Sequence, residues 1–196
     1  MMPGFSIFVT LLMGLGALSL RRSRSPFVGA VLAAGVVVTA GGVGADLGWL
    51  VGPGVVVAAV TLGVLVGRAV PAKSQPMLLL LAVLSAADII WIASSGDLSS
   101  EWLDRVLNFS VEIGASSSSI GTVDLILAAA LSAHWLERDE TILLSLTAAP
   151  LGMALANVYV GLSGAENLPL VPFITLGWLL TEITHRLTQN RRRRRT

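Results

Sequence analysis

The chain has 196 residues, of which 54% are hydrophobic and only 13% are charged, with a formal net charge of +1 and a mean hydropathy of +0.80. This composition excludes an ordinary soluble domain and indicates an integral membrane protein. Cysteine is absent, which excludes disulfides, thiolate metal sites and cysteine nucleophiles. The two histidines, His134 and His185, stand far apart in the sequence, so we expect neither a metal nor another cofactor.

Seven apolar stretches follow one another along the chain, and each is close to the roughly 20 residues that span a bilayer as a helix. They cover residues 3–20, 26–45, 50–70, 76–95, 119–136, 141–162 and 168–187. We therefore predict an all-α bundle of about seven transmembrane helices. It divides into a three-helix portion over 1–75, a four-helix portion over 76–187 with an outer loop at 96–118, and a basic tail at 188–196.

The first stretch is followed by arginines and not by a signal-peptide cleavage site, so it is predicted to remain as a membrane span. Glycines at small-xxx-small spacing predict that the second and third helices pack closely together. These glycines are Gly44, Gly48 and Gly52, and further along the chain Gly63 and Gly67.

Basic residues gather in the connections that seven spans would place on one side of the membrane. The clusters are Arg21, Arg22 and Arg24; Arg68 with Lys73; Arg138; and Arg186 with Arg191–Arg195. Asp46, the 96–118 loop and Glu166 then lie on the other side. The positive-inside rule predicts an outer N-terminus and a cytoplasmic C-terminus, in a multi-pass protein of a prokaryotic plasma membrane. The terminal arginines are interpreted as a basic stop beside membrane lipid, with no nucleic-acid partner.

Two aspartates, Asp88 and Asp124, interrupt the fourth and fifth apolar stretches. A carboxylate at the centre of a spanning helix costs at least ~2.5 kcal/mol, so such residues usually have a function. With antiparallel helices at 1.5 Å per residue, the two lie about 10 Å and 8 Å below the same outer face. Glu182 and His185, near the inner end of the last stretch, are expected to snorkel to the interface and to take no part in catalysis.

Residues 101–114 lie in the outer loop, and the spacing of their apolar and polar residues predicts an amphipathic helix on the membrane surface. Trp102, Leu103 and Val106 would share its apolar face, and such a helix could gate a site beneath it. Gly114 and Ser116–Ser119 follow as a predicted flexible link before the fifth span.

Three short motifs accompany the aspartates: Ala87-Asp88, Gly121-Thr122-Val123-Asp124 and Pro169-Leu170-Val171-Pro172-Phe173-Ile174-Thr175-Leu176-Gly177. In order and spacing they resemble the presenilin and signal peptide peptidase family of intramembrane aspartyl proteases, over residues 76–187. That family carries Tyr-Asp, Gly-x-Gly-Asp and a Pro-Ala-Leu-Pro segment continuing into Ile-Ser-Ile-Thr-Phe-Gly. Ala87 and Val123 stand where the family has tyrosine and glycine, and Leu170-Val171 stand for Ala-Leu.

The resemblance implies a protease that cuts peptide bonds within transmembrane helices by activating a water molecule. Asp88 and Asp124 would be the catalytic dyad, with no cofactor. Gly121 and the segment Pro169, Leu170, Val171 and Pro172 would contribute to substrate binding.

Two other functions remain open at the level of the sequence. The same aspartates could carry protons in a transporter or channel, since intramembrane carboxylates often do so. Alternatively, the chain could be an inactive family member that binds transmembrane helices without cutting them. A retinal-type photoreceptor is excluded because the only lysine, Lys73, lies in a predicted loop.

Overall fold

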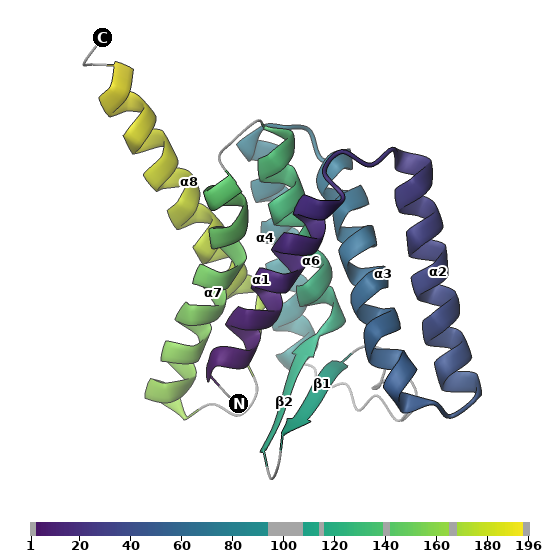
Figure 1. Ribbon diagram of the computed structural model, residues 1–196. Helices are drawn as coiled ribbons and strands as arrows, with labels where there is room; N and C mark the ends of the chain where they lie inside the picture. The colour runs from purple at the N-terminus through teal and green to yellow at the C-terminus, as the bar shows by residue number, and fades with distance from the viewer. Residues whose placement is uncertain (1–2, 94–107, 114–115, 139–141, 165–167, 194–196) are drawn as a thin grey trace.

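The computed structural model describes residues 3–93, 108–113, 116–138, 142–164 and 168–193. This part of the chain folds into seven helices and one two-stranded sheet (Figure 1). The elements in chain order are α1 (Pro3–Ser19), α2 (Ser25–Gly44), α3 (Gly48–Ala69), α4 (Ser74–Ala93), β1 (Asn108–Ile113), β2 (Ser116–Gly121), α6 (Thr122–Glu137), α7 (Ile142–Ser163) and α8 (Val171–Arg193).

Every predicted apolar stretch contains one helix, and each helix begins within three residues of the expected start, although the first residues of the fifth stretch belong to β2. Three of them, α2, α3 and α7, are long and apolar enough to cross a membrane, which marks the chain as a membrane protein. Shorter apolar helical segments cover Phe5–Ser19 and Ser74–Ile90. Helix α8 runs past the apolar stretch to Arg193, because residues 188–193 contain no glycine or proline that would end it. Much of the expected tail is therefore helical.

Helix α6 lies at the centre of the bundle, and each of its residues from 127 to 136 is buried. Helices α1, α3 and α7 pack around it, α2 covers the outer side of α3, and α8 packs on α7 and α4 (Figure 1). Among the described elements, α4 packs extensively only on α8. The N-terminus lies at the end of the bundle that carries the β-hairpin, and the C-terminus lies at the opposite end.

The glycine pairs differ from the prediction in the partners that they bring together. Helices α2 and α3 do pack closely, but through Gly35 and Gly54, while Gly44 and Gly48 face open space. A side chain on Gly63 would overlap the backbone oxygen of Ile126, so this part of α3 packs against α6. Helix pairs in membranes use small residues in this way because their backbones can then approach closely.

The hairpin overturns two expectations about the outer loop. Residues 108–113 form strand β1 and not the end of an amphipathic helix, and the serine run expected as a flexible link is strand β2. The strands pair antiparallel, from Asn108 opposite Gly121 to Ile113 opposite Ser116. Apolar and polar residues alternate along β1, a period of two that favours a strand. The rest of the expected surface helix, residues 101–107, lies outside the described residues.

Candidate functional site

Asp88 lies in α4, and its side chain meets the start of α8. Its carboxylate accepts a hydrogen bond from the backbone N–H of Val171 at 3.0 Å, and the backbone N–H of Leu170 also donates to it. The first N–H groups of a helix have no partner within the helix and carry partial positive charge, so a carboxylate is stabilised there. Asp88 therefore ties α4 to the predicted proline segment.

The prolines explain why α8 begins at this point. Pro172 is the second residue of the helix, where its missing N–H is not needed. The Leu170 carbonyl accepts the N–H groups of Phe173 and Ile174, both at 3.0 Å, and so closes the first turn. The Val171 N–H in this turn donates its hydrogen bond to Asp88. The tertiary position of the segment thus depends on a carboxylate 83 residues away in the sequence.

Asp124 is the third residue of α6, and its side chain is only 8% exposed. The backbone N–H of Gly121, the residue that precedes the helix, donates to its carboxylate. An acidic residue at this position commonly bonds back to the start of its own helix. The absence of a side chain at Gly121 leaves room for the Asp124 carboxylate, because a Cβ at residue 121 would lie 2.7 Å from Asp124 Oδ2.

The structure brings the two aspartates into one region. The charge of Asp88 acts on Asp124, so the carboxyls interact electrostatically between α4 and α6. Three helix segments therefore converge at this site: α4 with Asp88, the start of α6 with Asp124, and the start of α8 with Val171. In the described part of the chain, no group of three or more histidine, aspartate or glutamate side chains could hold a metal ion.

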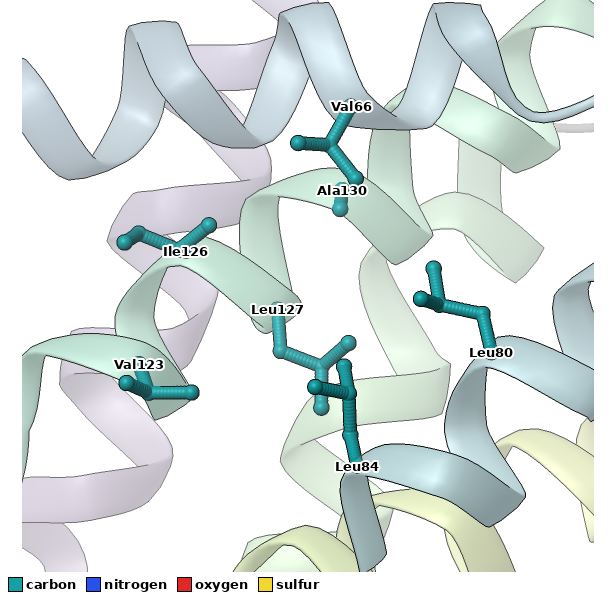
Figure 2. Close-up of a pocket in the computed structure, with 7 residues that line it drawn as sticks. All are labelled: Val66, Leu80, Leu84, Val123, Ile126, Leu127 and Ala130. Atoms are coloured by element: carbon teal, nitrogen blue, oxygen red, sulfur yellow. The ribbon is translucent and has the colours of Figure 1, made fainter. Parts of the chain in front are cut away.

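An apolar cavity of about 240 Å³ lies between α3, α4 and α6 beside this site (Figure 2). Its lining is entirely aliphatic and consists of Val66, Leu80, Leu84, Val123, Ile126, Leu127 and Ala130. Val123 immediately precedes Asp124, and its side chain is half exposed. Ala87, the other residue that differs from the family motif, is exposed on α4 beside Asp88.

One polar contact near the site was not predicted. The hydroxyl oxygens of Ser85 and Thr175 lie 2.9 Å apart and hydrogen-bond between α4 and α8. Ser85 precedes Asp88 by three residues and so shares its helix face, which is the signal that could have identified it. The pair adds a second tie between α4 and the segment that binds Asp88.

Glu182 does not snorkel to the interface as expected. Its side chain is buried at the middle of α8 and bonds to Ser74 at the start of α4, to Arg138 directly after α6 and to Arg186 of α8 itself. His185 is partly exposed and contacts the edge of the Trp135 ring, with centroids 5.7 Å apart.

Gly121→Ala should displace the Asp124 carboxylate without unfolding the protein. Gly121 has φ −63° and ψ 141°, which alanine adopts without strain, and the atom in the way is the end of a movable side chain. If this carboxylate is catalytic, a shift of about 1 Å is expected to reduce the rate roughly 100-fold. Peptide cleavage and thermal unfolding in detergent would be measured together. Full activity in the folded variant would contradict a catalytic position for Asp124.

Comparison with family models, with curated proteins and with solved structures gave no match to this chain.

Proposed function

We propose that the protein is an intramembrane aspartyl protease that hydrolyses peptide bonds of transmembrane segments. The observation that carries the proposal is the convergence of Asp88, Asp124 and the Pro169–Pro172 segment from three separate helices. The sequence resemblance implies that these three parts of the chain meet. The hydrogen bond from the Val171 N–H to Asp88 is a further contact, which the resemblance does not imply.

The reaction needs a water molecule, a base and an acid. Two carboxyls close together in a medium of low dielectric constant do not both ionise readily, so they share a proton. The ionised member removes a proton from water, and the protonated member donates a hydrogen bond to the scissile carbonyl. We assign these two roles to Asp88 and Asp124 as a pair.

A helical substrate hides its carbonyl groups in its own hydrogen bonds and must unwind before it is cut. The hairpin offers a partner for unwound backbone, because among the described residues its sheet has two strands and each has an edge with no neighbouring strand. Strand β2 ends at Gly121, directly before the helix that carries Asp124. A peptide added to this sheet as a third strand would be extended where it reaches the dyad.

The proposal includes the placement of the chain in the membrane. All seven helices span the bilayer, the hairpin end faces outward, and the basic ends of the helices face the cytoplasm of a prokaryotic cell. The basic clusters support this orientation through the positive-inside rule. This orientation can be tested with two variants that carry a single cysteine, one at Asp46 and one at Lys73. Each is treated on intact cells with a thiol reagent that does not cross the membrane. Labelling at residue 46 alone is expected, and labelling at residue 73 alone would reverse the orientation.

Cleavage of a synthetic transmembrane peptide by the purified protein in liposomes tests the activity. Mass spectrometry should find two complementary products whose masses sum to that of the peptide plus one water. Proton flux across the liposome membrane without peptide products would contradict the protease and favour a proton carrier. Tight peptide binding without products would favour an inactive, helix-binding protein.

Val123→Phe should narrow the space beside the dyad. Val123 lies at the rim of the aliphatic cavity, and its half-exposed side chain leaves room for a larger ring without repacking the core. We expect cleavage of peptides with bulky apolar residues at the cut site to fall by about tenfold, with the KM raised, since the lost contact is worth about 1–3 kcal/mol. The matched control is Val158→Phe, at a valine on α7 with 61% exposure. Equal rates for both variants and the parent would exclude the cavity as a substrate contact.

A further inference from the structure

A second polar cluster lies where α4 begins and α6 ends, beside the middle of α8. Glu182 of α8 is only 4% exposed. Its Oε2 accepts from Nη1 of Arg138, the residue directly after α6, at 2.8 Å, and its Oε1 accepts from Ser74 Oγ of α4 at 2.5 Å. Arg186, one turn along α8, donates to Oε1 at 2.7 Å and to Ser74 Oγ at 2.9 Å. One carboxylate therefore joins α4, α6 and α8.

The Glu182 cluster is far from the dyad along each helix. Fourteen residues separate Ser74 from Asp88, or about 21 Å, and eleven separate Val171 from Glu182, or about 17 Å. The cluster thus lies at the start of α4 and at the middle of α8, whereas the Asp88 contact lies towards the end of α4 and at the start of α8.

Helix α4 makes few other contacts with the described residues that would fix its distance from α6, so its contact with Glu182 matters for its position. Among the described elements α4 packs extensively on α8 alone, and its Leu80 and Leu84 line the aliphatic cavity that lies towards α6. Asp88 and Ser85 tie α4 to α8 at the outer end, but neither bonds to α6 in the hydrogen bonds described above. Glu182 is the hydrogen-bond partner that Arg138, directly after α6, shares with Ser74 of α4.

We infer that Glu182 is a positioning residue that sets the separation of α4 from α6, and with it the separation of the Asp88 and Asp124 carboxyls. The effect of Glu182 on catalysis rests on the proposed protease function. The effect of Glu182 on the separation of the helices does not. Removing the charge takes from Arg138 and Arg186 the anion that they share. The Arg138 side chain is only 13% exposed, against 61% for Arg186, and the loss of a partner is costly for a buried charge. The helices would then part at the inner end, and α4 would be free to move across the cavity.

A distance measurement tests the helix separation directly. The chain has no cysteine, so Val83→Cys on α4 and Leu62→Cys on α3 give two defined spin-label positions. Both side chains are exposed, and α3 reports on α6 because the two pack closely through Gly63 and Gly67. Double electron–electron resonance in liposomes should give one narrow distance distribution for the parent. Glu182→Gln should broaden it or shift it to longer distance, and Ser74→Ala, a milder change at the same cluster, should do so to a smaller extent.

Glu137→Gln provides the matched control. Glu137 pairs with Arg68 at 3.3 Å near the same end of the bundle, but this pair joins α3 to α6, which already pack tightly. Its distance distribution should equal that of the parent. Parent-like distributions in both Glu182→Gln and Ser74→Ala would overturn the inference, whether or not any form cleaves peptides. If Glu182→Gln does not fold, Ser74→Ala alone decides the result.

Enzyme kinetics then distinguish two causes of lost activity in Glu182→Gln, the misplacement of the carboxyls and the unfolding of the protein. In the folded fraction of Glu182→Gln, kcat should fall by about tenfold or more because the carboxyls are misplaced, with KM within about twofold of the parent. Unchanged kcat in a variant whose helices have moved apart would overturn the link to the dyad. Absence of cleavage by the parent itself would contradict the proposed function and leave the distance result standing.

Discussion

Asp88→Asn and Asp124→Asn should each abolish cleavage of a transmembrane peptide while leaving the protein folded. Asparagine has nearly the shape of aspartate, and its amide oxygen can still accept the hydrogen bond that Val171 donates to Asp88. It can neither remove a proton from water nor share one with the other carboxyl. General acid–base catalysis contributes about 10²–10⁴-fold for one group, so a loss of at least that size is expected in either variant. Product formation over hours in liposomes measures it.

Asp46→Asn is the matched control for both substitutions. Asp46 lies in the connection between α2 and α3, at the same end of the bundle as the aspartates, and is exposed. Its φ of 52° lies in the left-handed region, which asparagine tolerates well, so this variant should fold and cleave as the parent does. Cleavage that persists in Asp88→Asn or Asp124→Asn, at a rate near that of Asp46→Asn, would exclude the dyad.

The helices could be predicted from the sequence because length and hydropathy suffice in a membrane protein. An apolar stretch of about 20 residues has few alternatives to a helix, since its backbone groups must bond within the segment. The hairpin could not be found in this way. The alternation along β1 favours a strand, but the helical spacing of Trp102, Leu103 and Val106 directly before it predicts a helix that continues through these residues. Only the pairing of Asn108–Ile113 with the serine run decides between the two.

The candidate site could be predicted in part. The unusual placement of two aspartates in apolar stretches identified them, and the order of the motifs suggested that the proline segment lies nearby. The contact itself depends on the tertiary structure, because the Val171 N–H becomes available only where α8 begins beside α4. The snorkelling predicted for Glu182 is wrong for a related reason. Its position near the end of the apolar stretch 168–187 favours snorkelling, and only the approach of Ser74 and Arg138 from other parts of the chain makes burial favourable.

Gly177→Val should destabilise the protein and displace the proline segment in one step. A Cβ on Gly177 would overlap the backbone oxygen of Ala148 and the backbone nitrogen of Gly152 in α7, with Gly152 Cα at 2.9 Å. The overlap is reciprocal, since a Cβ on Gly152 would lie 2.6 Å from Ile174 Cα. Every one of these atoms belongs to the backbone, so no side-chain rotation relieves the contact and the two helices must separate.

The expected cost is about 1–3 kcal/mol or more, the usual range for overpacking a close contact. The cleavage rate of the fraction that remains folded should also fall, because α8 carries Val171 and Thr175, the partners of Asp88 and Ser85. Gly161→Ala is the control, at a glycine of α7 with no atom within 4 Å of its added Cβ. It should stabilise the helix by up to about 1 kcal/mol, because alanine is the better helix former. Thermal unfolding in detergent compares the two, and a Gly177→Val variant as stable as Gly161→Ala would show that α7 and α8 do not cross as closely as these glycines require.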